Sequence, residues 1–353
     1  MNTPIRLIPM ARQGRSQGIS LIELLISMVI GLVVVGVTFT NYLNSGRGRS
    51  SSAALGQMAE DANVALNFMR KQISLAGYSE PFRTNDTVGL ERKYTGRSVF
   101  GCNDALFAAL QIPTIGQLSC GAAAANSDAI AVAYEATRDN AIVNADTNRP
   151  RDCIGSGVAP TAAAGIAPNI VPAYFLAESR IYIANNTLMC QGNGQGNLPT
   201  AGSATSPAVP LTTPPQPLVD NIESLRITYG LSGMVKIDPL HAGEMHIAGR
   251  TPVQFVDASA VGDNTSTSWD NVVAVRVCIV VRSESEVMDS VTPYYGCDAI
   301  DSAATTPATT TPPDRRLYRA FSTTIMVQNR LGAPVPVSGT TPVSTPPVSG
   351  TTP

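Results

Sequence analysis

An apolar run near the amino end constrains this chain more than any other feature. Residues 19–39 read ISLIELLISMVIGLVVVGVTF, a run of 21 residues with a single charged side chain. A helix of about 20 apolar residues spans the hydrocarbon core of a bilayer. Arg12 and Arg15 precede the run, and basic residues on this side favour a cytoplasmic amino terminus. The sequence therefore predicts a membrane-spanning helix that leads into the rest of the chain.

The charged residue inside that run is Glu23. A carboxylate in a membrane helix costs about 2.5–3.5 kcal/mol on insertion scales unless it is paired or protonated. A secretory signal peptide does not fit, because the run is too long, contains Glu23 and is not followed by an A-x-A cleavage site. A plain membrane anchor fits the hydropathy but leaves the carboxylate unexplained. Glu23 is therefore a candidate functional residue.

The residues around Glu23 match a known export signal. The segment Gly18–Leu25 (GISLIELL) resembles the class III signal of type IV prepilins and of type II secretion pseudopilins. The resemblance implies that a membrane prepilin peptidase cuts after Gly18 and methylates the new amino terminus at Ile19, where the family usually has phenylalanine. It also implies that Glu23 pairs with the N-terminal amine of a neighbouring subunit and sets its axial register. A buried charge is tolerated when it has such a partner.

The helix is expected to continue beyond the membrane. Apolar residues recur at intervals of three and four, which is the pattern of an amphipathic helix. They are Leu55, Met58, Ala62, Leu66, Met69 and Ile73. Gly46 and Gly48 interrupt the pattern, and each weakens a helix by about 1 kcal/mol relative to alanine, so we expect a bend or a melted turn there. The region divides into a leader at 1–18, a transmembrane helix at 19–41 and an amphipathic helix at 42–78.

Residues 79–332 are expected to form a β-rich head. Short apolar segments between Gly, Pro, Asn and Ser clusters indicate strands. The clearest are 128–134, 180–184, 222–229, 271–282 and 316–328. The fourth of these is apolar except for Arg276 and Arg282, and is therefore expected to be a central strand. The predicted fold class is α+β, with the long helix packed on an antiparallel sheet.

Two segments of the chain have low complexity. Residues 301–315 and 333–353 are rich in Pro and Thr, and the second contains the repeated unit PVSGTTP. Such composition cannot bury enough apolar surface to fold. We expect a disordered loop and a disordered tail.

Four sequence blocks beyond the signal resemble the PilW family of minor pilins. In chain order they are Ile73–Tyr78, Val219–Leu225 with Tyr229-Gly230, Trp269–Val277, and Arg319–Ile325 with Asn329-Arg330. The resemblance implies a minor pilin that takes part in priming or tip assembly of the type IV pilus, and so in adhesion and twitching motility.

The same resemblance implies the partners and the location of the chain. The partners are other minor pilins, the major pilin, the prepilin peptidase, the inner-membrane assembly platform and a large tip adhesin. The chain is expected in the inner membrane, as a single span with its head in the periplasm. After assembly it is expected in the filament near the tip.

The cysteines indicate disulfide bonds. The six are Cys102, Cys120, Cys153, Cys190, Cys278 and Cys297, and no C-x-x-C occurs among them. This spacing does not favour zinc, whereas an exported chain favours disulfides. Fifteen full pairings are possible. We favour neighbours in sequence, because each closes a modest loop; reduced, buried thiols are the alternative.

No cofactor, metal or catalytic motif is predicted. Charged residues make up only 14% of the chain, against about 25% in soluble domains, and without the leader's three arginines 21 basic residues face 26 acidic ones. No nucleic-acid-binding signature occurs. His241 and His246 are not spaced as zinc ligands on a helix are. The glycine-rich residues 192–196 lack the other residues of a phosphate-binding loop. Asp263 and Asp270 are considered as calcium ligands, but no calcium-binding motif contains them.

Two alternatives stay open. A minor pseudopilin of a type II secretion system shares the signal, the helix and the α+β head. A membrane-tethered periplasmic enzyme is the more remote one. The carboxyl-terminal blocks favour the pilus.

Replacing Gly18 with a bulky residue tests the export signal. We expect the full-length precursor to accumulate in the inner membrane, because the peptidase no longer has a glycine before its cleavage point. Immunoblots of membrane fractions separate the precursor from the shorter mature chain. Normal processing of the variant would contradict the assignment.

Overall fold

The structure is a computed structural model that describes most of the chain. The described residues are 18, 20–82, 91–110, 114–123, 127–145, 148–166, 169–194, 214–232, 251–301, 307–327 and 329. The predicted leader up to residue 17, Ile19, the tail at 333–353 and part of the loop at 301–315 lie outside them. The chain divides into two units, residues 1–53 and residues 54–353.

Helix α1 runs from Leu21 to Leu75. It is continuous through Gly46 and Gly48, so no melted turn occurs there. The penalty of two glycines is small beside the cooperative hydrogen bonding of a helix 55 residues long. In the first unit every described side chain from residue 20 to residue 42 is exposed. Among the described residues of that unit, the helix therefore has no apolar partner.

The second half of α1 supplies one side of the core of the second unit. Four members of the predicted stripe are at most 2% exposed, namely Met58, Ala62, Met69 and Ile73. Leu66 is half-buried against the same core. The prediction that Leu55 packs on the head is wrong, because this residue at the start of the second unit is 37% exposed. Ala65 is fully buried in the stripe instead.

The carboxyl end of α1 is held by residues from distant parts of the chain. Gly77 follows the last turn with a φ of 73°, a conformation that glycine adopts without strain. Its N–H donates to the carbonyl of Ala133 at 2.8 Å. The Asn329 side-chain amide donates to the carbonyl of Ser74 at 2.6 Å. The helix end is thus bonded both to a central strand and to the end of the described chain.

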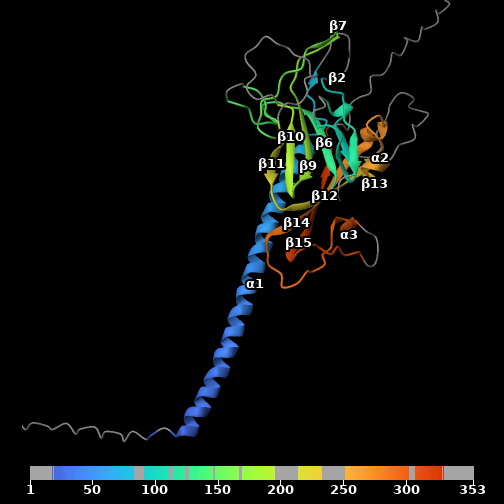
Figure 1. Cartoon of the computed structure of the whole chain (residues 1–353). Coiled ribbons are helices and arrows are strands. Elements are labelled where there is room, and N and C mark those ends of the chain that lie inside the picture. Colours follow the sequence, from blue (N-terminus) through green and yellow to red (C-terminus); the bar gives the residue numbers. More distant parts are fainter. Residues whose placement is uncertain are drawn as a thin grey trace, which may run out of the picture. The chain divides into compact units, whose positions relative to one another are not determined.

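Two antiparallel sheets make up most of the head (Figure 1). The five-stranded sheet has the order β11 (Gln216–Val219), β10 (Thr187–Gly192), β9 (Leu176–Ala184), β6 (Ala129–Glu135) and β3 (Val99–Cys102). The four-stranded sheet has the order β13 (Pro252–Asp257), β12 (Ile222–Ser232), β14 (Val272–Glu286) and β15 (Arg316–Met326). Arg70 of α1 donates to Thr323 of β15 at 2.7 Å, which ties the helix to the second sheet.

Smaller elements connect and flank the sheets. Three two-stranded sheets pair β1 (Pro81–Phe82) with β2 (Glu91–Arg92), β4 (Ala105–Phe107) with β5 (Cys120–Ala123), and β7 (Ala164–Ile166) with β8 (Asn169–Val171). The short helices are η1 (Ile115–Gln117), α2 (Ala258–Val261), η3 (Thr267–Asn271) and α3 (Cys297–Asp301).

The predicted α+β class is confirmed, and each of the five predicted strands overlaps an observed strand. The segment predicted to be central became β14, which lies between β12 and β15. Arg276, one of its two charged residues, lies 4.2 Å from the ring centre of Phe255. The single sheet that we expected is instead two main sheets. Alternating apolar residues predict where strands occur, but they do not determine which strands pair with one another.

Asp128 joins the two sheets. Its N–H donates to the carbonyl of Leu225 on β12 at 2.8 Å, and its carboxylate accepts from the N–H of Ile227 at 2.6 Å. The same carboxylate accepts from the N–H of Asp104 at 2.8 Å and lies 3.3 Å from Arg226. Burial outweighs these contacts and raises the pKa of Asp128 to about 6.

Three disulfides cross-link the head: Cys102–Cys120, Cys153–Cys190 and Cys278–Cys297. These are the neighbouring pairs that the sequence favoured. The third attaches α3 to the face of β14 that points away from α1, where Val280 and Tyr318 form a small second core. The ring of Tyr294 stacks on that of Tyr318 at 4.9 Å.

The buried carboxylate of Asp128 predicts how the stability of the head depends on pH. The pKa is about 6 in the folded chain and about 3.9 in an unfolded one, so the folded state takes up the proton first. Acidification from pH 7 to pH 5 should therefore stabilise the wild type by about 1 kcal/mol relative to Asp128→Asn.

Denaturant unfolding of the full chain in detergent micelles measures this difference. Trp269 is the sole tryptophan and is buried in the head, so its fluorescence reports the loss of the core. Parallel pH profiles for the wild type and the variant would contradict the role of Asp128.

Candidate functional site

The membrane end of α1 carries the residues of the export signal. Gly18 is exposed and precedes the first turn, and Glu23 lies in that turn. A negative side chain is favoured there by the helix dipole. The apolar span covers Leu21–Tyr42 with a mean hydropathy of 2.5 and no burial. Together with the signal, this span indicates membrane anchoring. The roles of Gly18, Ile19 and Glu23 stay predictions.

In the head, a loop between α2 and β14 is anchored from inside by Trp269. The indole is 1% exposed and packs edge-on against Tyr229 at 4.9 Å and against Phe100 at 5.3 Å. Its Nε1 donates to the carbonyls of Gly262 and Asp263 at 3.0 and 3.1 Å. The tryptophan therefore belongs to the core and holds the loop at 262–266 onto it.

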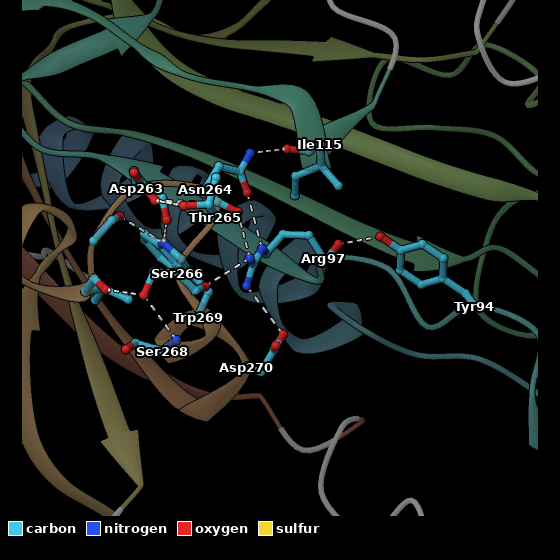
Figure 2. Close-up of polar contacts among 12 residues, drawn as sticks. Tyr94, Arg97, Ile115, Asp263, Asn264, Thr265, Ser266, Ser268, Trp269 and Asp270 are labelled. Atoms are coloured by element: carbon cyan, nitrogen blue, oxygen red, sulfur yellow. Dashed lines mark hydrogen bonds and ion pairs between the residues drawn. The ribbon is translucent and has the colours of Figure 1, made fainter.

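Arg97 holds the same loop from the other side (Figure 2). Its Nε donates to the side-chain oxygen of Asn264 at 3.2 Å, and Nη2 donates to the carbonyls of Asn264 and Ser266 at 2.8 and 3.0 Å. Nη1 lies 3.4 Å from the carboxylate of Asp270. The guanidinium thus binds two residues of the loop and Asp270 of η3, and its fixed planar donors restrict the loop's position.

Asn264 extends the network to a second loop. Its Nδ2 donates to the carbonyls of Ile115 and Leu118 at 2.7 and 2.8 Å. The N–H of Ile115 donates to Glu178 on β9 at 3.1 Å, and Glu178 lies 3.4 Å from Arg180 in a pair that is at most 2% exposed. Burial raises the pKa of Glu178 to about 7. Helix η1 is thus fixed between the five-stranded sheet and the loop of Asn264.

A cavity of about 520 Å³ lies between these loops. One wall comes from β3, η1 and the residues up to Cys120, and the other from α2 and the loop at 262–265. The volume is within the range of small-ligand sites. The disulfide Cys102–Cys120 adjoins it.

The structure places the acidic pair considered for calcium in separate contacts. Asp263 accepts hydrogen bonds from the N–H and hydroxyl of Thr265, whereas Asp270 faces Arg97. Among the described residues no group of three His, Cys, Asp or Glu side chains could hold a metal ion. His241 and His246 lie outside the described residues.

Sequence reasoning missed Arg97 and Asn264. Neither belongs to a recognisable motif, and their partners are up to 173 residues away along the chain. The only local sequence signal for this site was the block Trp269–Val277, which resembles the PilW family. In the glycine-rich segment, Gly192 ends β10, and the N–H of Gly194 donates to the buried carboxylate of Asp152 at 2.7 Å.

Comparison with known families identifies two parts of the chain. The profile of the family described as Type IV Pilus-assembly protein W matches residues 173–329. The prokaryotic N-terminal methylation motif matches residues 14–39. The first match includes β9 to β15 and the loop that holds Trp269; the second includes Gly18, Ile19 and Glu23.

The solved structures that match the chain include a type IV-like pilin from Thermus thermophilus. It is 10% identical, with 78% of this chain and 97% of that chain covered and a TM-score of 0.35. A chain of the GspK-GspI-GspJ complex of the type 2 secretion system from enterotoxigenic Escherichia coli is 12% identical. There, 75% of this chain and 96% of that chain are covered, with a TM-score of 0.29.

No curated protein matches the chain. The assignment therefore depends on the two family matches, which fall on the signal and on the sheets of the head. The chain carries a domain of the Type IV Pilus-assembly protein W family behind a prokaryotic N-terminal methylation motif.

Proposed function

We propose that this protein is a minor pilin that takes part in priming or tip assembly of a type IV pilus, and so in adhesion and twitching motility. The observation that carries the proposal is the presence of the methylation motif at 14–39 and the pilus-assembly domain at 173–329 in one chain. A role in assembly needs no reaction of the head itself.

The export signal prepares the chain for assembly. The prepilin peptidase removes the leader after Gly18 and methylates Ile19. Glu23 then pairs with the amine of a neighbouring subunit. The exposed apolar side chains of α1 support a position first in the membrane and then among other helices, because such side chains need an apolar environment. An unpaired carboxylate at that depth costs about 2.5–3.5 kcal/mol, so a subunit whose amine reaches Glu23 is favoured over one displaced along the helix.

The large size of the head favours a subunit that is present in few copies in the filament. Residues 79–332 form a large part of the chain, and three disulfides cross-link strands and other elements within them. The proposed partners are other minor pilins, the major pilin and the inner-membrane assembly platform, together with a large tip adhesin. Before assembly the head lies in the periplasm, and after assembly the subunit lies near the tip of the filament.

Deletion of the gene tests this function. We expect the mutant to lose most surface pili, counted by electron microscopy and by immunoblots of sheared filaments, because the priming complex is incomplete. The wild-type gene should restore them. Retained pili with loss of protein secretion would instead identify a type II secretion pseudopilin, and retained pili with lost adhesion would place the subunit only at the tip.

Glu23→Ala tests the charge pairing separately. The variant should reach the membrane and be cleaved normally, yet enter filaments at a level reduced about tenfold or more, since a penalty of 1.4 kcal/mol already changes an equilibrium tenfold. Glu60→Ala is the matched control, because it removes an exposed carboxylate from the same helix outside the apolar span. Filament entry of Glu23→Ala at the wild-type level would refute the pairing.

A further inference from the structure

The connection between β14 and β15 folds back over the sheet that these strands belong to. β14 ends at Glu286 and β15 begins at Arg316. The first part of the connection, residues 287–301, is a strap that ends with α3. Cys297 of the strap is bonded to Cys278 inside β14, so the strap returns along the strand that it has just left. α3 therefore lies beside β14 and β15 (Figure 1).

Packing by itself holds the strap weakly. Among its described side chains, Cys297 is the only buried one, whereas Val291 and Tyr295 are 42% and 60% exposed. Tyr294 is half-buried and stacks its ring on that of Tyr318. A segment that buries so little apolar surface opens easily unless a covalent bond retains it.

The polar contacts of the strap add little to this packing. Asp298 lies 3.4 Å from Arg226, but its side chain is 85% exposed, and exposed ion pairs contribute little to stability. The N–H groups of Tyr294 and Thr310 each donate to the other residue's carbonyl, at 3.0 and 2.8 Å. Thr310 belongs to the same connection, so this pair shapes the connection without bonding it to the sheet. The disulfide is therefore the main restraint on the strap.

The folded head covers the disulfide that restrains the strap. Cys278 and Cys297 are 1% and 4% exposed and belong to a small core apart from the main one. Tyr294 of the strap packs against this small core. In the disulfide Cys102–Cys120, by contrast, Cys120 is an exposed residue. Because reduction requires a thiolate to reach a sulfur atom, the head shields the bond under the strap more than it shields Cys102–Cys120.

The main core of the head lies on the other face of β14. Among the described residues, this core includes Val275, Val277 and Ile279. Successive side chains of a strand point to opposite faces of the sheet, so these residues face away from Cys278. The head can therefore keep its main core when the bond to Cys297 is absent.

We propose that Cys278–Cys297 is a conformational lock, which fixes the strap when it forms and which the folded head then protects from reduction. In the reduced chain the strap is detached, although the main core is folded. The lock closes when the two thiols give up two electrons and two protons to a disulfide oxidant, which becomes a pair of thiols. The position of the strap is thus set by oxidation of the chain as it folds. The inference concerns the head by itself and goes beyond the proposed role in pilus assembly.

Hydrogen exchange measured by mass spectrometry tests the lock on the full chain in detergent micelles. In Cys278→Ala/Cys297→Ala, peptides from residues 287–301 should exchange about tenfold faster than in the wild type, because the strap opens locally. Peptides from β9 and β12 should keep their wild-type rates. Cys102→Ala/Cys120→Ala is the matched control, since its bond has a sequence separation of 18 against 19 for the lock. Exchange of the strap should not change in this control.

Reduction of the folded wild type tests the protection of the lock. The chain is treated with dithiothreitol, and the free thiols are alkylated and located by mass spectrometry. Cys102–Cys120 should be reduced about tenfold faster than the lock, because its sulfur atoms are easier to reach. Tyr294→Ala should diminish this difference, since it uncovers the small core. Tyr295→Ala is the control, because it removes the neighbouring ring, which is 60% exposed.

Three results would overturn the proposal. They are wild-type exchange of the strap in Cys278→Ala/Cys297→Ala, loss of protection in β9 and β12 of the same variant, and reduction of the lock as fast as that of Cys102–Cys120 in the wild type. Because each readout is made on the isolated chain, none of them depends on the number of pili on the cell.

Discussion

Helix α1 changes its surroundings along its length, and the head depends on that change. Up to residue 42 its described side chains are exposed and mostly apolar, whereas Met58, Ala62, Met69 and Ile73 are almost completely buried. A helix that is apolar on every side requires lipid or other helices, and one with a single stripe requires a folded partner. The core of the head therefore forms on this stripe. The helix ends just before Gly77, and Asn329 donates a hydrogen bond to a carbonyl of its last turn.

Polar contacts then decide how the sheets and loops are arranged on that core. Asp128 bonds β6 to β12 through its N–H and its carboxylate. Arg97 and Asn264 bind the loop over Trp269 to η1. Each of these groups is buried or half-buried with several partners, and the loss of one partner from such a network costs more than the loss of an exposed hydrogen bond. The three disulfides add covalent restraints within the head.

The two units of the chain suit different parts of the proposed function. The proposed pairing of Glu23 requires an amine from another subunit, so its contribution would belong to the assembly and not to the isolated chain. The cavity beside Trp269 is complete within the head, because its walls come from the second unit. The first unit thus carries the residue of the proposed subunit contact, and the second unit carries the cavity.

The sequence by itself determined the membrane span, the export signal at Gly18–Leu25, the amphipathic stripe and the existence of five main strands. These features are local, since hydropathy, spacing and short motifs express them within a few turns or strands. Its preference for neighbouring cysteine pairs also agrees with the structure. Only the tertiary structure decided that the strands form two sheets, that Leu55 stays exposed, and that Arg97 and Asn264 bind the loops that border a cavity. Their contacts join residues more than one hundred positions apart, and the energy of such contacts depends on burial and geometry that no local pattern records.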